Sequence, residues 1–444
     1  MNKEFHKKQN FFSFSDIDSE RKDRIMKFTS TEATPAPHVP PGVLRLTGAA
    51  KEDIPMYRIQ TMNKISPVGL NRFPSELYEV GDAVQDPQGI LVRSAKLLDL
   101  EFNPSLLAIA RAGVGDNNIP LDRCAAAGIP VFSTPGANAN AVKELVICAM
   151  LMGSRDIPGA IRWVREQAAS GVDVSTVVEK GKSAFIGPEL YKKTLGIIGL
   201  GAIGSIVANT AISLGMDVYG YDPFLSVDTA LRLDRHVHVV KDINDLYKRS
   251  DYITMHIHYT EKTARMIDAS AIAAMKRGVR VINLARGEIV DDEAMLTALD
   301  TGMVAAYITD FPNNRLLTAP HVIAMPHLGA STPESEQNCA AMAVDTLRDY
   351  LESGNIRSSV NLPEMTMDRS GVQRLCVLHK NVPGMLANIT SLFGRDGVNV
   401  ENLSNKSRGD YAYTMVDLGS KVGDNVIEDV RRTANVIRVR SLEW

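Results

Sequence analysis

The stretch from Thr194 to Asp222 limits the possible folds of this chain more than any other part of the sequence. It contains an apolar run at 195–198, a G-x-G-x-x-G turn at 199–204, a helical pattern over 205–214, and a second apolar segment that ends at Asp222. A glycine hexamer alone is weak evidence, but here strand, turn, helix, strand and acidic residue follow one another in the order of a βαβ dinucleotide site. The stretch therefore predicts a parallel α/β domain that binds a dinucleotide.

The glycines of this turn have separate physical tasks. Gly199 permits the tight turn, Gly201 lets a pyrophosphate approach the backbone, and Gly204 allows the helix to pack closely on the strand. The helix starts at Ala202 and Ile203, whose free N–H groups face the phosphate charge. The alternative, a glycine-rich turn without a ligand, does not explain why all these elements occur together.

Asp222 indicates which dinucleotide is bound. It lies 23 residues after Gly199, where a carboxylate accepts hydrogen bonds from the adenosine ribose and repels a 2′-phosphate. The expected cofactor is therefore NAD rather than NADP.

Composition sets limits on the class of protein. With 444 residues, 45% hydrophobic and 23% charged, the chain is long enough for two or three globular domains. Its formal net charge of -3 gives no reason to expect nucleic acid or an anionic membrane as partner. Four widely spaced cysteines lack metal-site spacing, which predicts free thiols, no metal and a cytoplasmic location. No apolar run reaches the length of a membrane span.

Short apolar segments before the glycine turn predict another parallel sheet, with strands near 89–94, 106–111 and 129–133. Ligands of parallel sheets gather at the carboxyl ends of the strands. The residues expected at that edge are Arg93, Ser94, Arg111, Gly113, Gly115 and Asn138.

The rest of the chain completes a doubly wound sheet and adds a small domain. Strands are predicted near 237–240, 252–256, 279–283, 305–310 and 322–327, a long helix over 141–165 should lead into this sheet, and a helix over 334–353 should return from it. We expect residues 1–54 to form a flexible extension, 55–152 and 328–360 a discontinuous substrate domain, 153–327 a Rossmann domain, and 361–372 a linker.

Residues 373–444 show the order βαββαβ, which is typical of a ferredoxin-like half-sandwich. One face of its four-stranded sheet would need covering, so self-association into a dimer or tetramer is expected.

Four motifs together resemble the D-isomer-specific 2-hydroxyacid dehydrogenases over residues 57–362. They lie at 111–117, 199–204, 283–287 and 326–332, and the tail, with its motif at 379–384, is similar to an ACT regulatory domain. The resemblance implies a Rossmann cofactor domain inserted in a flavodoxin-like substrate domain, followed by an ACT domain.

The resemblance also assigns roles to residues. It implies hydride transfer from a 2-hydroxy acid to NAD, with His327 as proton shuttle and Arg286 as carboxylate ligand, roles that suit an imidazole and a planar guanidinium. Arg93 and Ser94 would hold the carboxylate or phosphate of the expected substrate, 3-phosphoglycerate, in the first step of L-serine biosynthesis. The cofactor wall would include His256, Asn283, Ala285, Asp310 and Gly329.

One departure from the family pattern concerns the partner of His327. A glutamate usually raises the basicity of the histidine, but the segment 308–315 contains no glutamate. Asp310 either replaces it as a catalytic residue or contacts the nicotinamide side, with Asn313 or Asn314 at the glutamate's position. An asparagine could orient an imidazole but could not stabilise an imidazolium by charge.

The tail residues His379, Asn381 and Asn399 resemble the contacts of serine-inhibited ACT domains, which would make L-serine an effector bound between two protomers. The alternative is a tail that serves only assembly. Two other functions remain open for the whole chain: another D-2-hydroxyacid dehydrogenase, or an NAD-sensing corepressor of the same fold.

Overall fold

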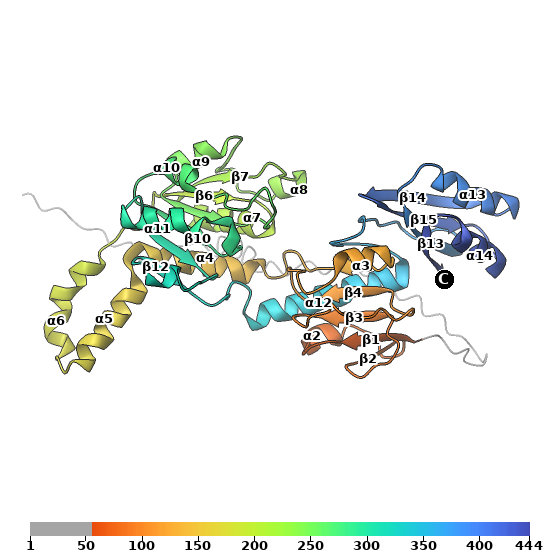
Figure 1. Ribbon diagram of the computed structural model, residues 1–444, viewed down its shortest axis with the longest axis horizontal. Helices are drawn as coiled ribbons and strands as arrows, with labels where there is room; N and C mark the ends of the chain where they lie inside the picture. Colours follow the sequence, from red (N-terminus) through yellow and green to blue (C-terminus); the bar gives the residue numbers. More distant parts are fainter. Residues whose placement is uncertain (1–55) are drawn as a thin grey trace, which may run out of the picture. The chain divides into compact units, whose positions relative to one another are not determined.

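The computed structural model describes residues 56–444, so the expected extension at 1–54 lies outside the described residues. The first sheet is parallel, with strand order β2-β1-β3-β4-β5 (Figure 1). Its strands are β1 (Tyr57–Thr61), β2 (Tyr78–Gly81), β3 (Gly89–Val92), β4 (Ala108–Arg111) and β5 (Val131–Phe132). This is the flavodoxin-like order.

Three helices accompany the first sheet: α2 (Pro67–Leu70), α3 (Leu121–Ala126) and α12 (Pro333–Ser353). The long helix α12 returns from the second domain and buries Ala340, Val344 and Leu347 in the core of the first. A methyl group at Gly69 would lie 2.6 Å from the carbonyl carbon of Ala340, so α2 and α12 are in backbone contact. This first domain, which is expected from the sequence to be the substrate domain, is therefore built from two separate parts of the sequence.

The second sheet has seven parallel strands in the order β12-β11-β10-β9-β6-β7-β8. Its strands are β6 (Thr194–Ile198), β7 (Asp217–Tyr221), β8 (Val237–Val240), β9 (Tyr252–Met255), β10 (Val279–Asn283), β11 (Val304–Thr309) and β12 (Val322–Ala324). The order reverses between β6 and β9, and this switch point is where doubly wound sheets bind their ligands.

Helices and short 3-10 turns cover the second sheet. They are α4 (Ala139–Arg155), α7 (Ala202–Ser213), α8 (Val227–Ala230), α9 (Ile243–Arg249), α10 (Ala269–Ala273), η2 (Gly287–Ile289), α11 (Asp292–Asp300) and η3 (Leu316–Thr318). The expected fold class, two doubly wound parallel sheets followed by a small α+β domain, is confirmed.

The expected single helix over 141–165 was wrong, because the chain breaks at Asp156. There the backbone is left-handed, with φ of 43°, and the Asp156 carboxylate accepts a hydrogen bond of 3.1 Å from the amide of Gly159. Pro158, in the first turn of the next helix, has no amide to continue the previous one. Apolar periodicity on both sides of the break hid this change of direction.

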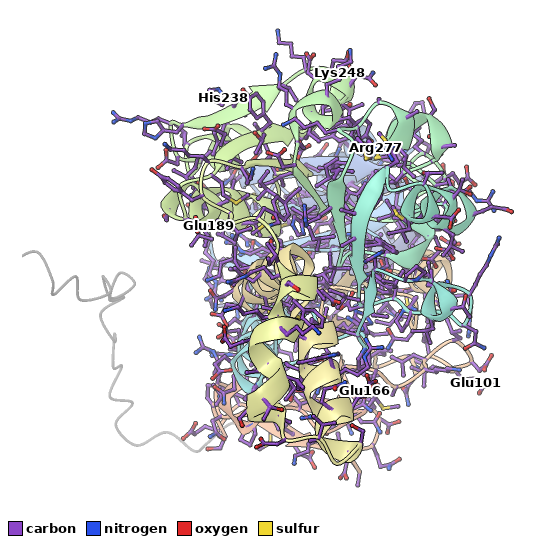
Figure 2. The ribbon with its side chains drawn as sticks, turned by 90° about the vertical axis from the view of Figure 1, so that its left-hand side faces the viewer. Glu101, Glu166, Glu189, His238, Lys248 and Arg277 are labelled. Atoms are coloured by element: carbon purple, nitrogen blue, oxygen red, sulfur yellow. The ribbon has the colours of Figure 1, made fainter. Side chains whose placement is uncertain are left out.

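Beyond Asp156 the chain forms a helical hairpin that we call the arm. It consists of α5 (Ile157–Ala169), α6 (Val174–Gly181) and η1 (Lys182–Phe185), and Figure 2 shows it with Glu166 labelled. Trp163 joins its halves, since its ring lies 6.1 Å from that of Phe185 and a methyl group at Gly181 would overlap it. Every side chain of α5 and α6 is at least partly exposed.

The C-terminal domain has the expected βαββαβ order and an antiparallel sheet ordered β14-β15-β13-β16. Its elements are β13 (Gln373–Lys380), α13 (Met385–Arg395), β14 (Val400–Arg408), β15 (Tyr411–Leu418), α14 (Asp424–Arg432) and β16 (Val436–Glu443). Both helices pack on one face through a core that includes Ile389, Phe393 and Val430.

The opposite face of this sheet is not free, which corrects the argument for self-association drawn from the sequence. Cys376, Tyr413 and Met415 on that face share one core with residues of the substrate domain. Arg440 donates hydrogen bonds of 3.0 and 2.9 Å to the carbonyl oxygens of Tyr350 and Leu351 at the end of α12. The chain therefore covers the face with its own residues.

The segment expected to be a linker, 361–372, is closely packed at its start. Leu362 and Met365 are buried, and the Asn361 side chain pairs with the carbonyl of Ile129 and the amide of Val131, each at 2.9 Å. Arg374, which follows it, forms a fully buried ion pair of 2.5 Å with Asp417.

No helix among residues 56–444 is long and apolar enough to cross a membrane. The same part of the chain holds no group of His, Cys, Asp and Glu side chains arranged to bind a metal ion.

Candidate active site

The glycine turn between β6 and α7 has the geometry that its sequence predicts. Gly199 is left-handed, with φ of 91°, and a methyl group on Gly204 would lie 1.9 Å from the Gly199 carbonyl oxygen. Around Gly201, by contrast, a methyl group would meet no atom of the described chain within 4 Å. The turn is therefore tight at its ends and open in the middle, beside the free N–H groups at the start of α7.

Asp222 is fixed just after β7. One carboxylate oxygen accepts a hydrogen bond of 2.9 Å from the amide of Leu200, and the other accepts one of 2.9 Å from the amide of Phe224. The carboxylate thus stands beside the glycine turn, where an adenosine ribose would meet it.

A cleft of about 1040 Å³ runs past these residues and receives side chains from both α/β domains. The expected site residues that line it are Asn138, Gly199, Gly201, Ala202, Ile203, Asp222, His256, Ala285, Arg286, His327 and Gly329. Gly204, Asn283, Asp310, Arg93, Ser94, Gly113 and Gly115 are not among its lining residues. The topology therefore gathers most of the expected cofactor residues along one cavity.

Sequence reasoning missed several lining residues on the loop after β9. Thr260 and Lys262 line the cleft, and the Thr263 hydroxyl organises the loop by donating a hydrogen bond of 2.8 Å to the His258 carbonyl. In the sequence, only their position after a strand at the switch point of the sheet indicated that they would line the cleft.

His256 forms part of the cleft wall as a neutral imidazole. Burial lowers its pKa to about 4, because desolvation disfavours the charged ring. Its Nε2 atom lies 3.2 Å from the Thr254 hydroxyl, and its amide donates to the Ile198 carbonyl at 2.7 Å.

Asn283 supports the site from behind. It is fully buried, donates from its amide nitrogen to the Arg286 carbonyl at 2.9 Å, and accepts from the Ala285 amide at 3.2 Å. It holds the turn that carries Arg286, which by itself explains an asparagine at this position.

Arg111 and Arg286 approach each other at the glycine pair that follows β4. A methyl group on Gly115 would lie 3.5 Å from Nη2 of Arg111 and 3.6 Å from Nη2 of Arg286. Gly113 is closer still, since a methyl group there would lie 2.5 Å from Nη1 of Arg111. Burial lowers the pKa of Arg111, the charge of Asp116 opposes this shift, and the charges of Arg286 and Arg93 add to it. The arrangement favours binding of an anion between the guanidinium groups.

Arg93 stands at the end of β3, as expected, but with a partner that the sequence did not indicate. Its Nη2 atom lies 2.6 Å from Oε1 of Glu336, in the first turn of α12. Asn63 fixes the backbone here, because its side-chain oxygen accepts from the amides of Ala95 and Ser94 at 2.8 and 3.1 Å.

His327 lies against an aromatic ring, since the rings of Phe311 and His327 are 4.7 Å apart. Within residues 56–444, no hydrogen bond joins its imidazole to another protein group. Asp310 instead turns one oxygen toward the Gly329 amide, at 2.9 Å. Its other oxygen is buried and unpaired within the described residues.

Asn313, one of the two candidates for the glutamate's position, is bonded elsewhere. Its amide nitrogen donates to Asp292 at 2.7 Å, and its oxygen accepts from the amides of Arg315 and Leu316.

The expected effector residues do not meet within one chain. His379 is buried, and its ring nitrogens pair with the Lys380 carbonyl and the Thr414 hydroxyl, each at 2.8 Å. Asn381 follows the end of β13, while Asn399 is bonded to the Gly419 amide beside the start of that strand. Their partners Asp410 and Gly419 are nine residues apart along β15, so at about 3.3 Å per residue the two asparagines are roughly 30 Å apart.

The residues present fit NAD. The open space at Gly201 is what a pyrophosphate requires, and the buried, unpaired oxygen of Asp310 is an acceptor suited to an amide of the nicotinamide ring. The Asp222 carboxylate completes the cradle at the ribose.

Comparisons with known proteins agree with this geometry. Residues 147–329 match the family model of the D-isomer specific 2-hydroxyacid dehydrogenase NAD binding domain, which confirms NAD as the cofactor. The D-3-phosphoglycerate dehydrogenase of Haemophilus influenzae is 31% identical over 379 residues, covering 82% of this chain and 88% of that protein. That of Synechocystis is 35% identical over 326 residues, covering 71% of this chain. The chain spans only 56% of the length of the Synechocystis protein.

Solved structures show the same fold. The NAD-bound 3-phosphoglycerate dehydrogenase of Entamoeba histolytica is 26% identical, with a TM-score of 0.54 over 69% of this chain and 99% of that one. An NADPH-dependent glyoxylate/hydroxypyruvate reductase from Sinorhizobium meliloti is also 26% identical, with a TM-score of 0.57 over 68% of this chain and 97% of that one. From the sequence relatives and the fold together, the chain belongs to the D-isomer-specific 2-hydroxyacid dehydrogenase family.

Proposed function

We propose that this protein oxidises D-3-phosphoglycerate to 3-phosphohydroxypyruvate with NAD. The observation that carries the proposal is the approach of Arg111 and Arg286 at Gly115, with the charge of Arg93 also acting on Arg111. A substrate with both a carboxylate and a phosphate needs several cationic groups in one place. The names of the sequence relatives support the same substrate.

The chemistry follows from the residues around the cleft. Arg286 binds the substrate carboxylate and orients the C2 carbon toward the nicotinamide. His327 takes the proton of the C2 hydroxyl as the C–H bond breaks. NAD, when bound, accepts the hydride from C2, which leaves a carbonyl group on the product. Arg111 and Arg93 hold the phosphate.

We assign Asp310 to the cofactor rather than to His327. Its bonded oxygen faces the Gly329 amide and its unpaired oxygen is free to accept a hydrogen bond from the nicotinamide amide. The ring of Phe311 then orients His327 by packing. Since no carboxylate of residues 56–444 is bonded to His327, the imidazolium depends on the carboxylate of the substrate and on solvent for its stabilisation.

Two other functions are distinguished by one assay. The protein could reduce a small 2-oxo acid, as the name of the Sinorhizobium structure indicates for that relative, or act as an NAD-dependent corepressor without turnover. Measuring NADH formation with 3-phosphoglycerate, D-glycerate and other D-2-hydroxy acids separates them. Turnover of 3-phosphoglycerate well above D-glycerate supports the proposal, and no turnover of any acid supports the corepressor.

We propose further that L-serine regulates the enzyme through the C-terminal domain. Since Asn381 and Asn399 lie at opposite ends of the sheet, a serine that contacts both must bind between two chains. Asparagine amides offer both donors and acceptors for an amino acid. Millimolar L-serine should lower the activity of the wild type and leave Asn381→Ala uninhibited. Equal activity with and without serine would leave the domain a purely structural role.

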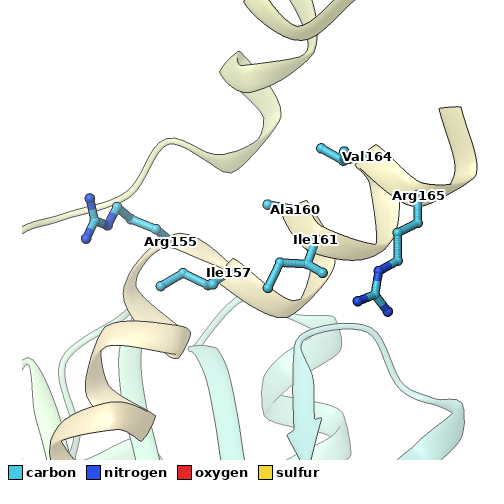
Figure 3. Close-up of a pocket in the computed structure, with 6 residues that line it drawn as sticks. All are labelled: Arg155, Ile157, Ala160, Ile161, Val164 and Arg165. Carbon is cyan, nitrogen blue, oxygen red and sulfur yellow. The ribbon is translucent and has the colours of Figure 1, made fainter. Parts of the chain in front are cut away.

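Copies of the chain would associate through the arm. Figure 3 shows the depression between α4 and α5, lined by Arg155, Ile157, Ala160, Ile161, Val164 and Arg165. Ile161 is 51% and Val164 38% exposed, which is unfavourable in water. Between residues 155 and 186 five basic and four acidic side chains leave a net charge of +1, so two copies of this surface can meet about a two-fold axis with little repulsion.

The mass of the Ile161→Asp variant in solution, measured by light scattering, tests whether copies of the chain associate through the arm. Dissociation of the wild-type oligomer into smaller species would support it, with Val164→Asp on α5 as a second variant of the same surface. A variant of unchanged mass would place the interface elsewhere.

Free thiols at all four cysteines suit the reducing cytoplasm, where we place the enzyme.

A further inference from the structure

The contact between Arg93 and Glu336 has no role in the reaction described above. The two side chains form an ion pair of 2.6 Å, with 42% of Arg93 and 45% of Glu336 exposed. It joins the end of β3 to the first turn of α12, two segments far apart in the sequence. A substrate anion that binds Arg93 must therefore meet a carboxylate already in place.

Both partners are presented from fixed backbone. Asn63 holds the amides of Ser94 and Ala95 on one side. On the other side Thr332 caps α12 by accepting from the Ser335 amide at 3.1 Å, and Cys339, one turn further on, is buried. Only the two long side chains can move apart without disturbing the fold.

Arg93 differs in this respect from the other two arginines of the site. Within residues 56–444 neither Arg111 nor Arg286 forms an ion pair, and their guanidinium groups bond to the side-chain oxygen of Asn118 and the carbonyl of Ala285. Arg93 alone is neutralised by a carboxylate. Arg111 and Arg286 thus form no ion pair among the described residues, although Asp116 acts on Arg111 by its charge, whereas Arg93 is available only when Glu336 leaves.

We propose that Glu336 occupies Arg93 in the free enzyme as an internal competitor, which the phosphate of the substrate displaces. The proposal rests on the proposed function, because it takes Arg93 as a phosphate ligand. Exposed ion pairs are weak, so a phosphate dianion can replace the carboxylate. A substrate without phosphate leaves the pair intact, so Glu336 determines how strongly the enzyme binds phosphorylated acids.

The test compares Glu336→Gln with Glu334→Gln. Both substitutions remove one negative charge from the first turn of α12, but Glu334 forms no ion pair within the described part of the chain. If Glu336 competes with phosphate, Glu336→Gln should lower the KM for 3-phosphoglycerate by about two- to fivefold. The kcat should stay near wild type, the KM for D-glycerate should not change, and Glu334→Gln should behave as wild type.

Direct binding of inorganic phosphate, measured by calorimetry on the NAD-loaded protein, separates the proposal from the reaction. Tighter phosphate binding by Glu336→Gln, lost again in Arg93→Ala/Glu336→Gln, supports the competitor role even if 3-phosphoglycerate is not turned over. If the variants bind phosphate in this way but the wild-type enzyme does not oxidise 3-phosphoglycerate, only the proposed substrate is rejected.

Two outcomes would overturn the proposal. Unchanged or weaker phosphate binding by Glu336→Gln would mean that Glu336 merely orients Arg93. An equal gain in both glutamine variants would mean that any negative charge at the start of α12 opposes phosphate.

Discussion

Arg111 and Arg286 direct their guanidinium groups at the same glycine, so that a methyl group on Gly115 would lie 3.5 and 3.6 Å from their Nη2 atoms. The two arginines come from different domains, one at the end of β4 and the other after β10. Burial lowers the pKa of Arg111, the charge of Asp116 opposes this, and the like charge of Arg286 lowers the pKa further. An anionic substrate that binds between the two guanidinium groups offsets the repulsion between these like charges. Substrate binding therefore favours the arrangement in which the two domains are close together.

Replacing Arg111 by lysine should test this pair. Lysine keeps the charge but loses the planar fork, so kcat/KM for 3-phosphoglycerate should fall by about tenfold to a hundredfold, the cost of about 1.4 to 3 kcal/mol. The melting temperature should change little. Arg123→Lys on α3, whose guanidinium bonds to the carbonyls of Leu98 and Leu100, is the control and should keep wild-type kinetics. Equal losses in both variants would point to general destabilisation of the domain.

Two glycines of the same turn should respond differently to alanine. At Gly201 a methyl group meets no protein atom of the described chain within 4 Å, so Gly201→Ala should fold and lose NAD affinity by about tenfold or more, because the methyl occupies the pyrophosphate's space. At Gly204 it would overlap the Gly199 carbonyl, so Gly204→Ala should lose about 1–3 kcal/mol or more of stability. Thermal melts with and without NAD measure both effects. Similar NAD binding by Gly201→Ala and wild type would contradict the cradle.

Asp310→Asn should distinguish a cofactor contact from a catalytic partner of His327. If Asp310 holds the nicotinamide amide, the KM for NAD should rise by about tenfold while the pH at which kcat/KM falls on the acid side stays unchanged. A large drop in kcat together with a shift of that acid limb to lower pH would instead make Asp310 the partner of His327.

His256 should make stability depend on pH in one window. Its pKa is about 4 in the folded protein and near 6.5 when unfolded. Between these values the unfolded chain binds more protons, so the free energy of unfolding should fall as the pH drops from about 6.5 toward 4. Urea midpoints of His256→Asn should fall less over this range than those of wild type. His238→Asn, at the exposed position labelled in Figure 2, is the control and should retain the wild-type slope.

The sequence predicted what depends on local pattern and on the rules of parallel sheets. The glycine turn, Asp222 and the strand ends carrying Arg286 and His327 all lie where the motif and topology place them, because each role depends on neighbours close in the chain. The turn at Asp156 was missed because apolar periodicity runs across it. Arg93 and Glu336 are more than 200 positions apart in the sequence. The contacts that bury the face of the C-terminal sheet join residues more than 50 positions apart. No local sequence pattern records such contacts.

The role of Asn283 shows a related limit. An asparagine at the end of a strand in a cofactor domain is reasonably expected to bind the cofactor. Its amide is in fact used by the backbone of Ala285 and Arg286. A polar residue that shapes a loop and one that touches a ligand have the same sequence signature, so only the structure separates them.

Phosphate recognition by the arginines is measured by the rate of NAD reduction with 3-phosphoglycerate and D-glycerate, two acids that differ only in the phosphate. We expect kcat/KM for 3-phosphoglycerate to exceed that for D-glycerate by about a hundredfold or more, corresponding to about 3 kcal/mol of phosphate recognition by the arginines. Equal values for the two acids, or a preference for D-glycerate, would contradict this expectation.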